Sequence, residues 1–340
     1  MKKKTDVAII GGGISGMEAA SALSRMGLNA ALIEEKEKLG GHVAQWDRLF
    51  PDGRHANELL KPLYDSLEGV DIYLNTKLAD VKREDNRYLL TLSDGTELDA
   101  DAVLLATGFS LFAAQRKEEY GYGIYDRTLT SVDLEQSFIN GKDLGAAGKA
   151  PLRIGFVHCV GSRDEKVCNR HCSKVCCVTA VKQAGELKEL HPNSRIYCFY
   201  MDLRMFGRYY EDMYYQAQNK YGIQFIRGRV SEVSENIEGN LVVKAEDTLA
   251  GQPLRVTLDY LVLMPGMECH ENAPQTAQFF NLSFAEDGFY QTKDGHNNNL
   301  LSNQQGVFFA GACTGPKTYT DSVNEARAAA VTIYKYLRQR

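Results

Sequence analysis

Five of the eight cysteines lie in one short segment, where thiols at close spacing bind metals or carry out redox chemistry. They follow the pattern C-x8-C-x3-C-x3-C-C, from Cys159 through Cys168, Cys172 and Cys176 to Cys177. Thiolates are soft ligands that suit iron–sulfur clusters or zinc. Zinc sites use paired C-x2-4-C knuckles, which adjacent cysteines fit poorly. The segment therefore predicts an iron–sulfur cluster, with zinc or a catalytic disulfide as the alternatives.

The local backbone decides which four cysteines bind the cluster. On a helix, Cys168, Cys172 and Cys176 share one face, because side chains four residues apart lie one above the other. Cys177 then lies about 100° from Cys176 around the helix axis. Helical periodicity alone therefore favours these three residues and Cys159 as ligands.

A second chemical motif lies near the start of the chain. Gly11, Gly13 and Gly16 form a G-x-G-x-x-G pattern between an apolar strand, residues 5–10, and a predicted helix. Such a turn lets a pyrophosphate approach the backbone at a helix N-terminus. Glu34 ends the next predicted strand, where its carboxylate can accept hydrogen bonds from ribose hydroxyls. The pattern predicts a dinucleotide site rather than a glycine-rich turn without a ligand.

Two later segments favour FAD over NAD. Residues 104–108 (LLATG) resemble the A-T-G strand end of two-dinucleotide flavoproteins, and residues 306–312 (GVFFAGA) resemble their C-terminal flavin motif. That motif usually has Asp after its last Gly to hold the ribitol, whereas this chain has Ala312. FAD is therefore predicted, with the ribitol held by the backbone or by another side chain.

The end of the chain predicts one more helix. Residues 322–325 (SVNE) read as a capping box that begins a helix from about Val323 to Leu337. The positive end of this helix could face the flavin ring and stabilise its anionic reduced form. The alternative is an ordinary capped surface helix.

Alternating strands and helices are expected around these motifs. The first strand, a helix to about Met26 and a strand at residues 28–33 form a βαβ unit. Residues 115–150 lack clear periodicity and predict a connection with short helical pieces. Further strands are expected at residues 72–79, 88–92, 96–105, 153–158, 195–200, 223–228, 230–246, 254–263 and 307–310, and further helices at 174–190 and 207–220.

The second α/β stretch has no fingerprint for a pyridine nucleotide. Disulfide reductases among the two-dinucleotide flavoproteins bind NAD(P)H in their second α/β domain, through a second G-x-G-x-x-G. In this chain the corresponding strand at 153–158 is followed by residues 159–163 (CVGSR), which lack that pattern. We predict an α/β, thioredoxin reductase-like two-dinucleotide-binding flavoprotein. Its Rossmann-type FAD domain is expected in residues 1–115 and 265–340, and an inserted α/β domain carrying the cluster in residues 116–264.

Composition excludes several classes of partner. The 340-residue chain has 44% hydrophobic and 24% charged residues and a net charge of -5. It shows no basic stripe, so a nucleic-acid partner is not expected. No apolar run approaches the ~20 residues that span a bilayer. The first residues lack the apolar region of a signal peptide, so a cytoplasmic location is predicted.

Several longer segments resemble the A subunit of heterodisulfide reductase and its relatives. They are residues 156–164 (FVHCVGSRD), 171–177 (HCSKVCC), 206–211 (FGRYYE), 225–229 (FIRGR) and 311–317 (GACTGPK). The resemblance covers almost the whole chain. It implies that Cys159, Cys172, Cys176 and Cys177 hold the cluster, which leaves Cys168 spare. The family also has Gly-Ala in the flavin motif, so Ala312 agrees with FAD.

The resemblance implies an oxidoreductase subunit in which FAD and a [4Fe–4S] cluster exchange electrons. The chain lacks the ferredoxin-type C-x2-C-x2-C-x3-C segments of methanogen subunits, and residues 41–46 (GHVAQW) lack the cysteines that follow in those forms. It looks most like the A subunit of the heterodisulfide reductase-like complex of sulfur-oxidising prokaryotes. The alternatives are the A subunit of the quinone-interacting oxidoreductase of sulfate reducers, a stand-alone flavin disulfide reductase, and a non-redox flavoprotein.

The implied partners are other iron–sulfur and thiol-chemistry subunits, a lipoate-binding protein and a second copy of the chain. Lys317 is the candidate catalytic residue, because an ammonium beside the flavin favours negative charge on the reduced ring; the alternative is an exposed lysine. Cys198 and Cys313 are expected to be packed thiols. Cys269 and His270 form a neighbouring pair in a loop, for which a redox role is the less favoured alternative. The expected FAD-contacting positions are Gly11, Gly13, Ile14, Ser15, Gly16, Glu34, Glu35, Gly41, His42, Val43, Leu78, Ala106, Thr107, Gly108, Gly311, Ala312, Lys317 and Ser322.

Overall fold

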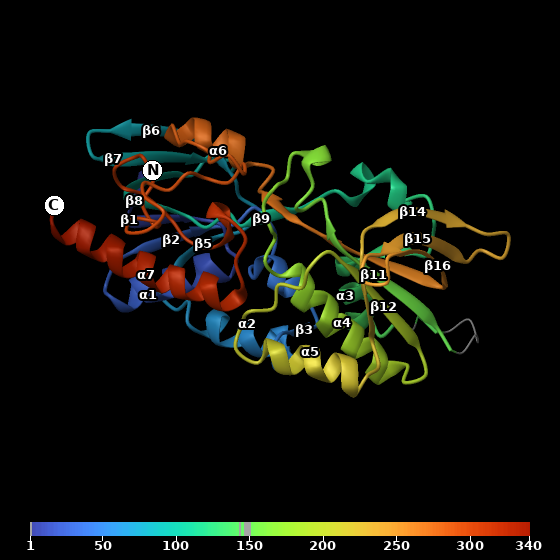
Figure 1. Ribbon diagram of the computed structural model, residues 1–340. Coiled ribbons are helices and arrows are strands. Elements are labelled where there is room, and N and C mark those ends of the chain that lie inside the picture. Colours follow the sequence, from blue (N-terminus) through green and yellow to red (C-terminus); the bar gives the residue numbers. More distant parts are fainter. Residues whose placement is uncertain (1, 143, 146–150) are drawn as a thin grey trace. The chain divides into compact units, whose positions relative to one another are not determined.

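The computed structural model describes residues 2–142, 144–145 and 151–340, and the chain divides into two compact units (Figure 1). Unit 1 comprises Met1–Ala44, Ala56–Ser110 and Glu268–Arg340, and unit 2 comprises Gln45–His55 and Leu111–Met267. The sequence placed residues 45–55 with the flavin domain, whereas the structure places them in unit 2. Part of the predicted connection at 115–150 lies outside the described residues.

Unit 1 is built on a mostly parallel sheet. Its described strands follow the order β5 (Asp71–Tyr73), β2 (Ala30–Ile33), β1 (Lys2–Ile10), β8 (Glu97–Leu105), β7 (Arg87–Leu92) and β6 (Leu78–Glu84), and β19 (Val307–Phe309) also pairs with β8. The pairs β6–β7 and β7–β8 are antiparallel. The second halves of β1 and β8 are buried, as continuous apolar runs in central parallel strands predict.

The helices of unit 1 are α1 (Ile14–Arg25), α2 (Ala56–Asp65), α6 (Ala273–Phe280) and α7 (Tyr319–Arg338). Helices α1 and α7 lie side by side on one face of the sheet (Figure 1). The predicted capping box at residues 322–325 was wrong. The structure caps α7 with Thr318, whose hydroxyl accepts a hydrogen bond from the Asp321 amide at 3.1 Å while the Asp321 carboxylate accepts one from the Thr318 amide at 3.0 Å.

Unit 2 contains a parallel sheet whose described strands follow the order β10 (Thr128–Thr130), β17 (Tyr260–Pro265), β11 (Arg153–Val160), β12 (Arg195–Tyr200) and β13 (Gln224–Arg227). Its helices are α3 (Ser131–Ile139), α4 (Cys176–Leu190) and α5 (Tyr210–Asn219). Strands β14 (Val230–Glu235), β15 (Leu241–Asp247) and β16 (Gln252–Leu258) form an antiparallel meander.

The remaining described elements are short. They are β3 (Arg48–Leu49), β4 (Arg54–His55), β9 (Phe109–Leu111), β18 (Met267–Cys269) and the 3-10 helices at Gly41–Gln45, Ala114–Arg116, Glu118–Tyr120, Glu165–Val167 and Ala312–Thr314. None of the helices that the structure describes is long and apolar enough to cross a membrane.

Strand β11 separates two apolar cores in unit 2. Ile154 and Phe156 pack into the core that includes the buried face of α4, whereas Val157 and Val160 pack into the core that includes the meander. Burial of such side chains stabilises the fold by about 1.5–3 kcal/mol each. The cysteines at the end of β11 and the start of α4 are therefore carried by two elements packed against one another.

The second half of α4 carries buried charges. The Lys182 ammonium lies 2.5 Å from the Glu135 carboxylate and 3.3 Å from that of Glu186, and it donates to the carbonyl of Arg48 at 2.9 Å. Burial raises the pKa of Glu186 from 4.5 to about 7; the nearby Glu135 carboxylate raises it further, while Lys182 opposes both effects. At neutral pH, the native state therefore holds a proton on Glu186 more tightly than the unfolded chain does.

We expect unit 2 to lose stability as pH rises from about 5 to 8. Because the native pKa of Glu186 is raised, ionisation opposes folding above the unfolded pKa and its full cost is present above pH 7. Glu186→Gln should remove this cost, so the variant should be more stable than the parent by about 1–3 kcal/mol at pH 8 and nearly equal at pH 5. Urea unfolding at both pH values measures this difference.

The exposed Glu189 on the same helix provides the control. Glu189→Gln should leave the pH dependence of stability unchanged. Equal free energies of unfolding for Glu186→Gln and the parent at pH 8 would contradict the assignment.

Candidate functional site

The glycine-rich turn joins β1 to α1 at the carboxyl edge of the unit 1 sheet. Gly11 has φ +107°, and a Cβ there would lie 2.4 Å from the Ala106 carbonyl oxygen. A Cβ at Gly16 would lie 1.9 Å from the Gly11 carbonyl oxygen. Only glycine permits these approaches. The turn is therefore held against the end of β8, where the A-T-G residues follow.

The first turn of α1 keeps its backbone amides available. Gly13 is the N-cap and provides no side-chain hydrogen bond. The Glu34 carboxylate is buried and accepts hydrogen bonds from the amides of Gly12 at 2.7 Å and Lys36 at 2.9 Å. It is thus held beside the turn. Exposed N–H groups and the positive end of a helix favour an anionic ligand.

The start of α7 lies beside the start of α1. The Ser15 hydroxyl on α1 donates to the Ser322 carbonyl on α7 at 3.3 Å, so Ser322 contributes its backbone rather than a cap. Strands β1, β8 and β19 are neighbours, so the glycine motif, the residues after Leu105 and the flavin motif meet at one edge. The three motifs that predicted FAD are therefore brought together within unit 1.

Lys317 forms a partly buried ion pair. Its ammonium lies 3.1 Å from the Glu325 carboxylate and donates to the Gly311 carbonyl at 2.9 Å. Glu325 also accepts a hydrogen bond from the Gly311 amide at 3.1 Å. Sequence reasoning missed this role of Glu325 because it treated the residue as part of a helix cap. The structure places Lys317 and Glu325 together at the flavin motif.

The other predicted FAD positions lie on several elements of unit 1. The His42 imidazole is stacked on Phe109, with ring centroids 4.2 Å apart, and Nε2 lies 2.8 Å from the Phe109 carbonyl oxygen. Burial lowers the pKa of His42. Glu35 accepts a hydrogen bond from the Asn272 amide at 2.8 Å and lies 3.4 Å from the Lys77 ammonium. Both side chains already have protein partners. The remaining predicted positions here are Ile14 in α1, Gly41 and Val43 in the 3-10 helix, Leu78 in β6, Thr107 and Gly108 after β8, and Ala312 after Gly311.

Three of the clustered cysteines meet where β11 ends and α4 begins. Cys159 lies near the end of β11, and Cys176 and Cys177 form the first turn of α4. All three are buried, and the sulfur atoms of Cys159 and Cys176 are 3.9 Å apart. The Cys177 thiol lies 3.9 Å from the Asp202 carbonyl oxygen.

The three thiols differ in acidity. Hydrogen bonds donated by Cys176 lower the pKa of Cys159 and of Cys177, against the opposing effect of burial. The neighbouring ring of His158 lowers the pKa of Cys177 further. Sharing its proton with these two thiolates raises the pKa of Cys176 well above its ordinary value. Thiolates rather than thiols bind metals, so the lowered pKa values of Cys159 and Cys177 favour the ligating form.

The loop before α4 has an unusual backbone. Cys159, Arg163, Cys168 and Lys174 have φ values of +59°, +54°, +62° and +63°, a region that non-glycine residues rarely adopt. Each such residue costs of order 1–3 kcal/mol unless the surroundings impose it. The loop is therefore held in place by contacts within the loop and with the chain after β17.

Those contacts come from a pair of serines. The hydroxyls of Ser162 and Ser173 lie 2.8 Å apart, and the Ser173 hydroxyl accepts a hydrogen bond from the Met267 amide at 2.8 Å. A Cβ at Gly266 would lie 2.8 Å from that of Ser162, so the chain after β17 packs closely against the loop. Buried hydrogen bonds of this kind offset the backbone strain.

Helical periodicity was wrong for the first half of the cysteine segment. Helix α4 begins at Cys176, and Cys168 lies outside it in a left-handed conformation with an exposed side chain. Cys172 is partly exposed, and its sulfur accepts a hydrogen bond from the Lys174 amide at 3.3 Å. The Arg163 guanidinium interacts electrostatically with both Cys159 and Cys172.

Cys159, Cys172, Cys176 and Cys177 supply four thiols, the ligand type that iron–sulfur clusters use, and the structure brings Cys159, Cys176 and Cys177 into contact. Among residues 2–142, 144–145 and 151–340, no three or more His, Cys, Asp or Glu side chains are arranged to hold a metal ion. The fit to a cluster therefore rests on the chemistry and burial of the thiols.

The remaining cysteines are packed thiols. Cys198 and Cys313 are fully buried, and burial raises the pKa of both. The Cys313 thiol donates to the Leu105 carbonyl at 3.3 Å. Burial raises the pKa of the partly exposed Cys269 to about 11. These protonated groups are poor nucleophiles at neutral pH.

Known oxidoreductases are similar to this chain in sequence. Residues 1–132 match the pyridine nucleotide-disulphide oxidoreductase family. The second iron-sulfur A subunit of CoB–CoM heterodisulfide reductase from Methanopyrus kandleri is 30% identical over an alignment of 412 residues, which covers 95% of this chain and 63% of that protein. The chain is a relative of the heterodisulfide reductase A subunits.

A further relative is the A subunit of the H2/formate:CoB–CoM heterodisulfide, ferredoxin reductase of Methanococcus maripaludis, 39% identical over 238 residues. That alignment covers 68% of this chain and 36% of the relative. The chain thus spans 63% or less of the length of these two relatives. Both relatives are named as subunits of reductases.

Solved structures identify the fold. Thioredoxin reductase of T. acidophilum matches with a TM-score of 0.67 at 16% identity, covering 98% of this chain and 99% of that one. Thioredoxin reductase of Lactococcus lactis matches with a TM-score of 0.68 at 18% identity, covering 99% and 100%. The predicted thioredoxin reductase-like, two-dinucleotide-binding flavoprotein fold is confirmed.

Gly13 offers a test that separates cofactor binding from folding. A Cβ at Gly13 meets only the Gly41 Cα at 3.9 Å, an ordinary contact, and the φ of -73° suits alanine. Gly13→Ala should therefore fold normally, but its methyl group should occupy the space through which a pyrophosphate reaches the backbone. We expect FAD to bind at least tenfold more weakly, because overpacking by one methyl costs about 1–3 kcal/mol.

FAD affinity is measured by fluorescence titration of the apoprotein, and folding by thermal unfolding without FAD. Gly16→Ala is the matched comparison: its Cβ collides with Gly11, so the fold itself should be destabilised. Unchanged FAD affinity in a folded Gly13→Ala protein would rule out this turn as the pyrophosphate site.

Proposed function

We propose that the chain is an electron-transfer subunit that binds FAD in unit 1 and a [4Fe–4S] cluster in unit 2. The observation that carries the proposal is the placement of Cys159, Cys176 and Cys177. Their thiols lie buried at the carboxyl end of β11 and the N-terminus of α4, where reductases of this fold would bind a pyridine nucleotide. When bound, FAD exchanges one or two electrons and the cluster exchanges one at a time.

The unit 1 site suits FAD in two respects. The amides at the start of α1 favour the pyrophosphate, and the Glu34 carboxylate is held by Gly12 and Lys36 in the position for ribose hydroxyls. The ion pair of Lys317 with Glu325 fixes the Gly311 backbone of the flavin motif. Lys317 thus acts as a positioning residue whose charge is balanced by Glu325.

The unit 2 site suits a cluster ligated by Cys159, Cys172, Cys176 and Cys177. Two of these thiols have lowered pKa values, and the N-terminus of α4 favours negative charge on Cys176 and Cys177. Arg163 adds a positive charge near the site. Each of these effects favours thiolates, which a cluster with several thiolate ligands requires.

The proposed assembly is a heterodisulfide reductase-like complex that works in sulfur oxidation in the cytoplasm. The motif at residues 156–164 and the short cysteine segment support this assignment. Other iron–sulfur and thiol-chemistry subunits, a lipoate-binding protein and a second copy of the chain would be its partners. The A subunit of a quinone-interacting oxidoreductase remains the second candidate.

Anaerobic purification followed by iron, sulfide and flavin assays tests the cofactor content. We expect four iron atoms and one FAD per chain, and an EPR signal from the reduced protein. Cys172→Ser should abolish the iron content and the EPR signal while FAD stays bound, because the two cofactors occupy different units.

Cys168→Ser is the matched control, because Cys168 is exposed and lies outside α4. It should retain both iron and FAD. Loss of iron in Cys168→Ser but not in Cys172→Ser would contradict the ligand set, and zinc in place of iron in the parent protein would contradict the function.

A further inference from the structure

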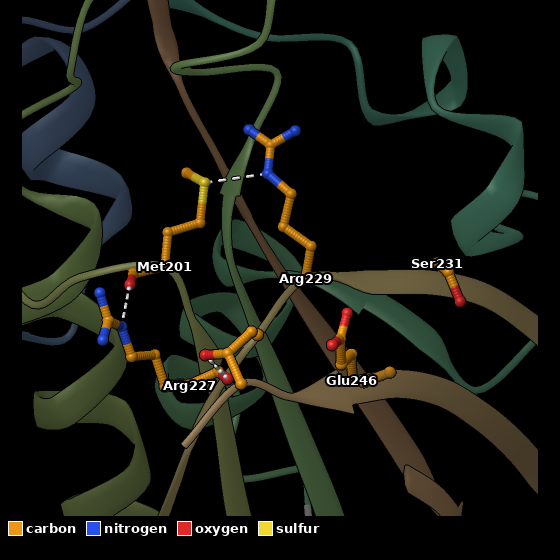
Figure 2. Close-up of a pocket in the computed structure, with 8 residues that line it drawn as sticks. Met201, Arg227, Arg229, Ser231 and Glu246 are labelled. Atoms are coloured by element: carbon orange, nitrogen blue, oxygen red, sulfur yellow. Dashed lines mark hydrogen bonds between the residues drawn. The ribbon is translucent and has the colours of Figure 1, made fainter. Parts of the chain in front are cut away.

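A pocket of about 700 Å³ lies in unit 2 beyond the carboxyl ends of β12 and β13. Met201, which follows β12, and Arg227, the last residue of β13, line it together with Arg229, Ser231 and Glu246 (Figure 2). Ligands of open α/β sheets bind outside the carboxyl ends of the parallel strands. The cofactor sites described above make no use of this pocket.

The two arginines of the pocket keep hydrogen-bonding capacity for an anion. Arg227 donates from Nε to the Met201 carbonyl at 3.2 Å, and Arg229 donates from Nε to the Met201 sulfur at 2.9 Å (Figure 2). No carboxylate of the described residues pairs with either guanidinium. A thioether is a weak acceptor, whereas a carboxylate binds guanidinium with charge-assisted, bidentate hydrogen bonds.

The pocket is connected to the cysteine site by direct contacts. Arg229 donates from Nη2 to the Arg163 carbonyl at 2.6 Å, and Arg163 forms an ion pair with Asp202. Asp202 follows Met201 in the chain, and its carbonyl faces the Cys177 thiol. Arg229 thus contacts Arg163, Arg163 pairs with Asp202, and Asp202 contacts Cys177. An anion held by Arg229 would therefore lie close to the cysteine site.

The surroundings of the cysteine site are basic although the chain as a whole is acidic. Residues 163–174 and 201–209 contain six Lys and Arg but three Asp and Glu, against a net charge of -5 for the chain. The Phe206 side chain is 73% exposed and the Lys174 ammonium lies 5.9 Å from its ring centre. Exposed aromatic and Arg side chains together are typical of protein interfaces.

We propose that the Arg227–Arg229 pocket receives a carboxylate side chain of an acidic electron-transfer protein. The inference rests on the proposed function, because it gives the cluster in unit 2 a partner that binds beside it. Charge complementarity supports this occupant: a basic surface steers an acidic protein toward the site and sets its orientation. Glu246, on the wall of the pocket, opposes the same anion.

Calorimetric titration of the anaerobically purified full chain tests the proposal. The probe is a small acidic [2Fe–2S] ferredoxin, and the basic haem protein cytochrome c is the control of opposite charge. Replacing both Arg227 and Arg229 with Gln should weaken ferredoxin binding about tenfold and reduce its salt dependence. Glu246→Gln should strengthen binding about threefold, an effect of opposite sign from the same pocket.

Arg195→Gln is the matched control, since Arg195 is exposed at the other end of β12. It should change the dissociation constant for ferredoxin less than twofold. Ferredoxin binding that is unaffected by the double substitution, or cytochrome c binding as tightly as ferredoxin, would overturn the proposal. A third outcome would also overturn the proposal: the chain does not bind ferredoxin but binds inorganic pyrophosphate, and this binding requires both arginines. The pocket would then be a site for a small phosphate compound.

Iron and flavin content of the same preparation separates the two proposals. A chain without iron would end the proposed function even if ferredoxin bound through the arginines. If the chain contains iron but its affinity for ferredoxin does not depend on Arg227 and Arg229, only the docking proposal fails.

Discussion

Parallel pairing brings the carboxyl ends of neighbouring strands to one edge of a sheet, and every site in this protein depends on that constraint. In unit 1 the pairing of β1, β8 and β19 joins segments that lie far apart in the chain, so the turn at Gly11 meets the flavin motif at Gly311. In unit 2 the neighbours β11, β12 and β13 bring Cys159, Met201 and Arg227 to a single edge. The cysteine site and the Arg227–Arg229 pocket are neighbours because β11, β12 and β13 are adjacent in the sheet.

The same edge serves different chemistry in the two units. In unit 1, glycines allow the backbone to approach a ligand and the amides of α1 remain available. In unit 2, Cys159 near the end of β11 has a left-handed backbone conformation. Helix α4 begins with two cysteines, whereas a glycine-rich turn precedes α1 in unit 1. A helix N-terminus favours negative charge in both cases, a phosphate in one and thiolates in the other.

Two groups of charged side chains in unit 2 differ in burial: one is buried and the other is exposed. The Lys182 cluster in the latter half of α4 is buried and paired, so it acts on stability and its dependence on pH. The arginines near Met201 are exposed and lack carboxylate partners within the described chain, so their charge acts on what approaches from solution. Buried charges and surface charges of one small domain thus have separate consequences.

The sequence by itself determined the fold class and the places of both motifs. A G-x-G-x-x-G turn has few uses between an apolar strand and a helix, and continuous apolar runs indicate central parallel strands. It also identified the cysteine segment as the unusual feature of the second domain. Periodicity failed inside that segment, because the rule that places Cys168 with Cys172 assumes a helix.

Only the tertiary structure decided which cysteines share a buried site. Left-handed residues at Cys168 and Lys174 are locally unfavourable, and hydrogen bonds from Ser162, Ser173 and the chain at Met267 impose them. The same holds for Glu325, whose carboxylate meets Lys317 and Gly311 only after α7 has begun at Tyr319. Local sequence preferences are worth tenths of a kcal/mol to about 1 kcal/mol per residue, and several tertiary contacts together outweigh them.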